Sequence, residues 1–330
     1  MLTFTKRSLL AAGAAAIAVS SLGFAGSAAA EPKTIAIAQF GKHPQLDLVT
    51  ETFRDELAKR GYGPDEVVFV ENQVNFEAPL IPQMLTNLRG SDPVLILTIT
   101  TPVTQVARQL LEGAGIPVVF AAVTDPVAAQ LTPSWDKAGP FITGSSDLQD
   151  LDAVAAFTRK LFPDAKTLAF PYNPGEDNDT ATLAVMEKVA PAHGFTVLPL
   201  GVDNTNDIPI RIQSLAGKAD VMYVPASNLL QPAMPAIAAA AQNIKLPIVN
   251  SSQAEVVSGQ VPASFEVDYG QVGRNAAAIA AEILEGKPVD QIPPVKPTYA
   301  DHRALINKAV MEQLGKTVPA DLADCNCFTK

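Results

Sequence analysis

The feature that most constrains the fold is a repeated alternation of short apolar runs with helical patterns. Apolar runs of strand type occupy residues 34–39, 67–71, 94–98 and 118–121. Between the first two runs, residues 46–60 place Leu46, Val49, Phe53 and Leu57 on one helical face. Strands that alternate with helices form parallel sheets that helices cover on both faces. The order therefore predicts an α/β fold.

A second set of the same kind fills residues 152–250, after a stretch at residues 142–151 that is rich in Gly, Ser and Asp. A chain of 330 residues exceeds what one hydrophobic core usually supports. We therefore predict two lobes, each a parallel sheet flanked by helices. The expected division is residues 31–147 with 268–290 for lobe one, 148–267 with 291–318 for lobe two, and 319–330 as a tail.

The first thirty residues have the three parts of a secretory signal peptide. Lys6 and Arg7 form a basic start, residues 9–24 are mostly apolar, and Ala28–Ala30 complete an Ala-x-Ala end. The apolar stretch is short and alanine-rich for a membrane span. We expect cleavage near Ala30 and a periplasmic protein, exported by the general or the twin-arginine route.

Charge limits the classes of macromolecular partner, and cysteine content bears on a disulfide or metal site. Removal of residues 1–30 takes two of the 24 basic residues and leaves 22 against 34 acidic ones, a net charge of −12. Such a surface argues against nucleic acid and anionic membranes as partners. Cys325 and Cys327 could close only a very small ring, and we interpret them as part of an exposed tail. A metal site would need two more ligands, so no metal or cofactor is expected.

Polar residues follow the predicted strands at the points where these strands end. Ligands of open parallel sheets bind at the carboxyl ends of the strands, and helix N-termini there favour anions. A well-capped helix is the alternative explanation for the Thr-Pro and Asp-Pro junctions. The candidates from these junctions are Thr100, Thr101, Thr104, Thr124, Asp125, Tyr172, Asn173, Glu176, Ser227 and Asn228.

Several stretches resemble a known family over nearly the whole chain. They are IAIAQ at 35–39 with His43-Pro44, TPVTQ at 101–105, FAAVTDPV at 120–127, TGSSD at 143–147, YNPGE at 172–176, YVP at 223–225 and VDY at 267–269. In this order they resemble bacterial ABC-transporter substrate-binding proteins, the family that includes tryptophan- and phenylalanine-binding members. VTDP and YNPGE are the most distinctive of these stretches.

The resemblance implies a type I periplasmic binding protein fold, in which two α/β lobes are joined by three hinge crossovers around a cleft. It assigns a ligand carboxylate to Thr100, Thr101 and Thr104, and an ammonium group to Asp125 and Asp268. A side-chain pocket would use Phe40, Tyr172 and Tyr269, with Gln39 beside them. Expected hinges are residues 144–147, 250–252 and 267–268. Where many relatives carry an acidic residue after YVP, this chain has Ala226-Ser227-Asn228, which puts the ligand's polarity in doubt.

The function expected from these observations is capture of a small molecule by hinge closure. The ligand is predicted to be an amino acid with an apolar or aromatic side chain, which a monomeric protein presents to a membrane permease without catalysis. Alternatives are a nucleoside, sugar or organic acid as ligand, or service to a sensor. A hydrolase is disfavoured because His43, His193 and His302 are the only histidines and no Gly-x-Ser-x-Gly elbow occurs.

Overall fold

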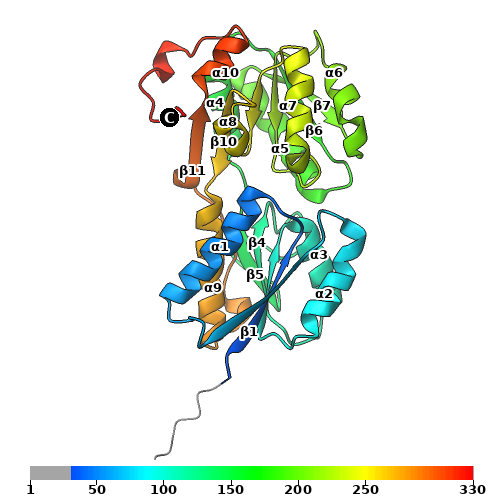
Figure 1. Ribbon diagram of the computed structural model, residues 1–330, viewed down its shortest axis with the longest axis vertical. Coiled ribbons are helices and arrows are strands. Elements are labelled where there is room, and N and C mark those ends of the chain that lie inside the picture. Colours follow the sequence, from blue (N-terminus) through cyan, green and yellow to red (C-terminus); the bar gives the residue numbers. More distant parts are fainter. Residues whose placement is uncertain (1–30, 330) are drawn as a thin grey trace, which may run out of the picture. The chain divides into compact units, whose positions relative to one another are not determined.

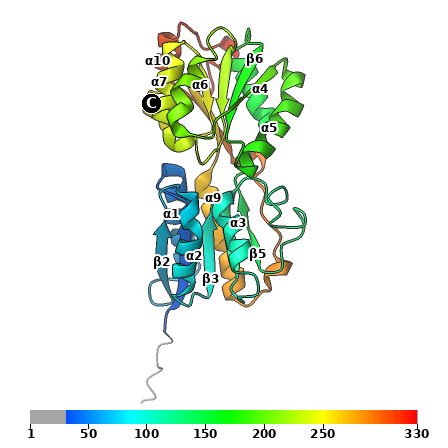
Figure 2. The same cartoon turned by 90° about the vertical axis from the view of Figure 1, so that its right-hand side faces the viewer.

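A computed structural model describes residues 31–329, which form two sheets, each with its own helices (Figure 1). The predicted signal peptide at residues 1–30 lies outside the described residues. Within residues 31–329, no helix has both the length and the apolar character needed to span a bilayer. The two groups of elements are also separate in the view turned by 90° (Figure 2).

Lobe one is the five-stranded sheet with its helices, and its strand order is β2-β1-β3-β4-β5 with all neighbours parallel. Strands β3 and β4 are buried at every residue, as expected for strands that helices cover on both faces. The elements are β1 (Lys33–Gln39), α1 (Pro44–Lys59), β2 (Val67–Gln73), α2 (Ile81–Arg89), β3 (Leu95–Ile99), α3 (Thr101–Leu110), β4 (Val118–Val123), β5 (Ile142–Ser146) and α9 (Tyr269–Leu284).

Lobe two is the six-stranded sheet with its helices, in the order β11-β10-β9-β8-β6-β7. Only β11 runs antiparallel to its neighbour. The chain re-enters lobe two beside the end of β10, so that His302 at the start of β11 pairs with Val267. The elements are α4 (Leu151–Leu161), β6 (Thr167–Tyr172), α5 (Asp177–Val189), β7 (Thr196–Gly201), α6 (Ile208–Gln213), β8 (Val221–Val224), α7 (Met234–Asn243), β9 (Ile248–Asn250), α8 (Ala254–Val257), β10 (Ala263–Val267), β11 (His302–Ile306) and α10 (Lys308–Gln313).

Helix α9 belongs to lobe one although it follows most of lobe two in the chain. Its residues Val272 and Ala276 are buried in one cluster with Val49 of α1, and the two helices lie side by side in Figure 1. Gly273 allows this close packing, since a Cβ there would collide with the Val49 carbonyl and the Thr52 hydroxyl. The late segment therefore completes the lobe-one core.

The chain crosses between the lobes after β5, after β10, and in the segment before β11. Val295 still pairs with lobe one, because its N–H donates to Gly144 O at 2.8 Å and its carbonyl accepts from Ser146 N at 2.9 Å. Lobe one thus extends beyond the expected end at residue 290. Residues 250–252, expected to be a hinge, instead lie at the end of β9 inside lobe two.

The C-terminal segment packs on lobe two and is not the exposed tail that the sequence suggested. Cys327 is buried, and Phe328 packs against the same apolar cluster. Ile306 N donates to Cys327 O at 2.6 Å, and Thr329 N donates to Ile306 O at 3.0 Å. A disulfide joins Cys325 to Cys327. The segment therefore covers the outer edge of β11.

Candidate functional site

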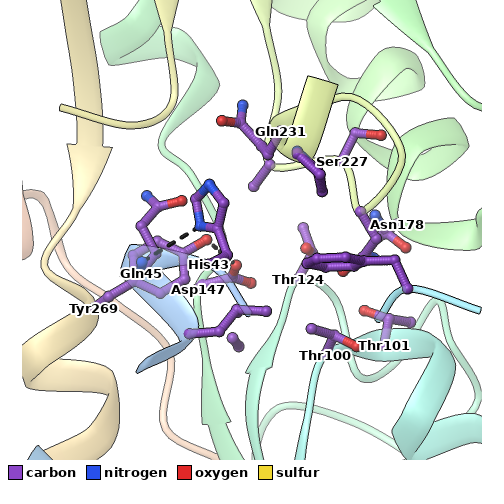
Figure 3. Close-up of a pocket in the computed structure, with 16 residues that line it drawn as sticks. His43, Gln45, Thr100, Thr101, Thr124, Asp147, Asn178, Ser227, Gln231 and Tyr269 are labelled. Carbon is purple, nitrogen blue, oxygen red and sulfur yellow. Dashed lines mark hydrogen bonds between the residues drawn. The ribbon is translucent and has the colours of Figure 1, made fainter. Parts of the chain in front are cut away.

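A cavity is lined by residues from both lobes (Figure 3). Lobe one contributes the beginnings of α1 and α3 and the end of β4, and lobe two contributes the beginning of α5 and the segment after β8. These are the carboxyl ends of parallel strands, where the sequence placed the site. Six predicted residues line it, namely Thr100, Thr101, Thr124, Ser227, Asn228 and Tyr269.

The junction between β3 and α3 has a strained backbone. Thr100 has φ +90° and ψ 157°, a conformation that is rare for a β-branched residue, and its N–H donates to Ala121 O at 3.1 Å. Ala122, also in the cavity wall, has φ +53° at an irregularity of the β4–β5 register. Strain of this kind gathers at ligand sites, where the surrounding structure holds it in place.

Helix α3 directs its N-terminus at the cavity. Thr100 is the N-cap residue, one position before the threonine of the Thr-Pro junction, and its buried hydroxyl has no hydrogen-bond partner within residues 31–329. The first amides of a helix have no intrahelical acceptor and favour an anion. Thr104 does not line the cavity, because its hydroxyl donates to Thr100 O at 2.8 Å and supports the turn from below.

Asp147 supplies the only carboxylate among the described residues that line the cavity, and no Lys or Arg lies among them. It follows β5 and is only 3% exposed. Its Oδ2 accepts a hydrogen bond from the Tyr269 hydroxyl at 2.6 Å, while Oδ1 has no donor in the described structure. Burial raises the pKa of Asp147. A cationic ligand group at Oδ1 would stabilise the ionised form.

Glu176 joins the two lobe-two loops behind the cavity wall. It accepts hydrogen bonds from Asn228 N at 3.2 Å, Asn228 Nδ2 at 2.7 Å and Leu229 N at 3.1 Å. Asn173 Nδ2 donates at 3.0 Å to Oε1, the same oxygen that accepts from Leu229 N, while both Asn228 groups donate to Oε2. Neither Glu176 nor Asn173 lines the cavity, and Tyr172 lies outside it near Gly201. Glu176 and Asn173 therefore support the wall instead of forming it.

The remaining predicted residues have local partners away from the cavity. Asp125 caps the next turn, accepting from Val127 N at 2.9 Å and Ala128 N at 3.0 Å. Asp268 caps α9 by accepting from Gln271 N at 3.0 Å, and lies 3.5 Å from Arg274. For both aspartates the structure thus favours the helix-cap reading over an ammonium contact.

The first strand of lobe one also turns its end away from the cavity. Gln39 Nε2 donates to Gly41 O and to Asp47 Oδ1, each at 2.8 Å. Phe40 is 4% exposed and packs edge-on against Phe76, with ring centroids 5.4 Å apart. It is Phe76, which sequence reasoning missed, that lines the cavity.

The other lining residues that were missed come from both lobes. Asp147 was predicted only as part of a hinge at residues 144–147, whereas residues 142–146 form a buried strand whose carboxyl end belongs to the site. His43 caps α1 through Nδ1, which accepts from Gln45 N at 3.4 Å, and burial lowers the pKa of His43. Further missed lining residues are Gln45, Leu46, Ala122, Asn178, Ala226, Gln231 and Pro232.

Direct hydrogen bonds between the lobes flank the cavity. Gln45 Nε2 of α1 donates to Ser251 O at 3.0 Å and to Glu266 Oε2 at 3.3 Å. Gln105 Nε2 of α3 donates to Asp177 Oδ2 of α5 at 2.7 Å. The lobes therefore contact each other through side chains on more than one side of the site.

A family model described as ABC transporter substrate binding protein matches residues 34–325. The chain belongs to this family. Its members are transport proteins that act outside the cytoplasm and bind small molecules for a membrane permease. This confirms the family and the binding function that the sequence motifs predicted.

Similar proteins include a tyrosine-binding protein from Clostridioides difficile, 31% identical over 283 residues, which are 86% of this chain and 81% of the relative. A structure of an ABC domain from Streptococcus pneumoniae in complex with L-Trp has a TM-score of 0.82 at 28% identity. The match covers 90% of this chain and 99% of that one. These similarities confirm the predicted type I periplasmic binding protein fold.

The ligand-free, open structure of a substrate-binding protein with adhesive properties from Clostridium difficile gives a lower TM-score of 0.69. Its identity of 28% and its coverage of 90% and 99% equal those of the L-Trp complex. In this chain, hydrogen bonds join the two lobes directly, as described above.

Proposed function

We propose that this protein captures an amino acid with an aromatic side chain between its lobes and delivers it, unchanged, to the permease of an ABC importer. The observation that supports this most is that one cavity offers both a site for a positive charge and a site for a negative charge. The free oxygen of Asp147 offers a site for a cation, and the N-terminus of α3 with the Thr100 hydroxyl offers a site for an anion.

A zwitterion matches this arrangement because each of its charges leaves water only when it is paired. In the proposal the α-ammonium group contacts Oδ1 of Asp147, in place of the expected Asp125 and Asp268. The α-carboxylate accepts from the first amides of α3 and from the hydroxyls of Thr100 and Thr101. No lysine or arginine is required for this carboxylate, in keeping with the described lining.

Phe76 supplies the contact for an aromatic ring. Asn75 and Phe76 have φ +49° and +64°, so a left-handed turn presents the ring, and Phe76 N donates to Phe40 O at 2.9 Å. A Cβ at Gly41 would collide with the Phe76 ring, which shows how closely the ring is held. A preorganised aromatic wall favours ring–ring contact with a ligand. The tyrosine and tryptophan named for the similar proteins fit this class.

The cellular setting follows from the family and the first thirty residues. We infer that the chain is exported, cleaved near Ala30 and active as a monomer in the periplasm, where the closed lobes present a surface for a permease. The general mechanism is selection of the closed state by ligand, since ligand contacts both lobes only when they are closed.

The test is calorimetric titration and thermal unfolding of residues 31–330 against amino acids, nucleosides, sugars and organic acids. An aromatic amino acid should bind and should stabilise the fold by about 2.7 kcal/mol at one hundred times its dissociation constant. Asp147→Asn should weaken binding at least tenfold, while Asp152→Asn on the surface of α4 should not. Binding only of ligands without an α-amino group would refute the assignment.

A further inference from the structure

Asn178, the second residue of α5, presents an unpaired acceptor in the cavity wall. The residue is 4% exposed and lines the cavity (Figure 3). Its Nδ2 donates to Asp179 Oδ1 at 2.9 Å and to Glu176 Oε2 at 3.3 Å. Its Oδ1 is buried and has no donor within the part of the chain that the structure describes.

The orientation of this amide is fixed by the two carboxylates behind it. A flipped amide would set Oδ1 against Glu176 Oε2, which already accepts from Asn228 N and Asn228 Nδ2 and has no proton to donate. Because the oxygen and nitrogen of an amide diverge from one carbon, Nδ2 on the carboxylates turns Oδ1 away from them. Glu176 is held by Asn228, Leu229 and Asn173 as described above, so the whole support is itself fixed.

Gln231 repeats the pattern on the neighbouring loop. Its Nε2 is fully used, donating to Pro225 O at 2.8 Å, Asn250 Oδ1 at 2.9 Å and Ser251 Oγ at 3.0 Å. Its Oε1 is buried and has no donor among the described residues, and Gln231 also contributes to the cavity lining. Both lobe-two amides therefore have their N–H groups engaged and an oxygen left over.

We propose that Asn178 selects ligands whose side chain carries an N–H or O–H donor, such as a phenol or an indole, over ligands whose ring has none. This rests on the proposed function, in which Asp147 and α3 take the α-ammonium and α-carboxylate groups. A ligand without a ring donor leaves Oδ1 buried and unpaired, and that penalty is larger than the gain from one ordinary hydrogen bond. Glu176 is the positioning residue that keeps the acceptor turned toward the ligand.

Matched ligands test the proposal on the unaltered protein. The dissociation constants of tyrosine, phenylalanine and O-methyltyrosine, and of tryptophan and 1-methyltryptophan, are measured by calorimetry. Each ligand without the ring donor should bind at least about tenfold more weakly than its partner. Equal binding of tyrosine and phenylalanine would overturn the proposal, and would indicate that Oδ1 accepts from the α-ammonium group instead.

Variants test the roles of the two residues through the ratio of the phenylalanine and tyrosine constants. Asn178→Leu, similar in size but without the acceptor, should bring the ratio close to one. Glu176→Gln should also lower this ratio. The new side-chain NH₂ group replaces an oxygen that accepts hydrogen bonds, so it would face the N–H groups that now donate to Glu176. Glu187→Gln, an exposed change on the same helix, should leave it unaltered. A general loosening of the wall would weaken both ligands equally and keep the ratio, which contradicts the proposal.

The two proposals fail in different ways. If no amino acid binds, the proposed function is wrong and the selectivity falls with it. If aromatic amino acids bind but the ring donor makes no difference, the function stands and only the role of Asn178 is refuted. Circular dichroism and thermal unfolding confirm that each variant is folded, and Asn178→Ala replaces Asn178→Leu if the latter does not fold.

Discussion

Tyr269 donates its hydroxyl hydrogen to Oδ2 of Asp147 across 2.6 Å, and this bond joins two of the crossings between the lobes. Asp147 follows β5 on the first crossing, and Tyr269 begins α9 directly after the second. The carboxylate proposed to hold the ligand's ammonium group is therefore positioned by a residue of the hinge region. The hydrogen-bonded pair of Asp147 and Tyr269 therefore lies both at the proposed ligand contact and at the hinge.

Removal of that hydroxyl should affect stability as well as binding. In Tyr269→Phe the buried carboxylate loses its donor, which costs about 1–3 kcal/mol of unfolding free energy. Urea denaturation measures the loss, and Tyr299→Phe, at a residue that is 68% exposed, is the matched control. The affinity for an aromatic amino acid should fall in parallel. An unchanged urea midpoint would show that the bond contributes nothing to folding.

Thr100→Gly should separate stability from affinity. A β-branched residue at φ +90° has a conformational penalty of about 1–3 kcal/mol, which glycine does not have. This gain offsets the entropy that glycine adds to the unfolded chain. We expect a free energy of unfolding equal to or above that of the wild type. Because the unpaired hydroxyl is lost, the dissociation constant should rise about tenfold. A variant that is less stable but binds normally would contradict both arguments.

Loss of a cross-lobe hydrogen bond should weaken binding without any change in the cavity lining. Gln105 lies outside the cavity, yet its amide bonds to Asp177 across the lobes. Gln105→Ala should raise the dissociation constant about two- to fivefold, because the closed state loses about 0.5–1 kcal/mol. Gln83→Ala, exposed on α2, provides the control. Small-angle scattering of the ligand-free variant should show a more expanded average than the wild type, and identical profiles would argue against this.

Stability should fall as pH rises, in part because of Glu266. Burial raises the pKa of Glu266 to about 8, although Gln253 N and Gln45 Nε2 donate to it. Between the ordinary value near 4.5 and pH 8, the native state keeps a proton that the unfolded state releases. The proton-binding difference therefore lowers the unfolding free energy across this window.

Glu266→Gln keeps an acceptor for Gln253 N and removes the titration. Urea midpoints at pH 5 and pH 8 should differ less in this variant than in the wild type. Asp147 and Asp179, whose pKa values burial also raises, should account for part of the remaining slope. Equal slopes in the two proteins would refute the contribution of Glu266.

Most of the fold could be predicted because its strands are continuous apolar runs with helices between them. Strands β10 and β11 escaped, since Ser264, Glu266 and Arg303 interrupt the apolar pattern. Their pairing depends on a chain return from the other lobe, which no local pattern encodes. The same applies to Val295, whose place beside β5 follows from the proline-rich crossing that precedes β11.

The site could be predicted at the level of strand ends but not of individual side chains. Thr100 and Ser227 line the cavity as expected, whereas Asp125 and Glu176 have enough backbone N–H groups nearby to occupy their carboxylates. Sequence shows which residues follow a strand and does not show which of them find a local partner. Asp147 was predicted as a hinge residue, and its place in the site depends on residues 142–146 being a strand, which their Gly- and Ser-rich sequence did not indicate.

The placement of α9 against α1 has a consequence for how the chain acquires its structure. The residues that cover the apolar face of α1, among them Val272 and Ala276, are more than two hundred positions after Val49. Since the chain is synthesised from its N-terminus, this face stays exposed until nearly all of lobe two has been made. Assembly of lobe one is the step most open to chaperones and to aggregation, and it cannot finish before lobe two is available to fold.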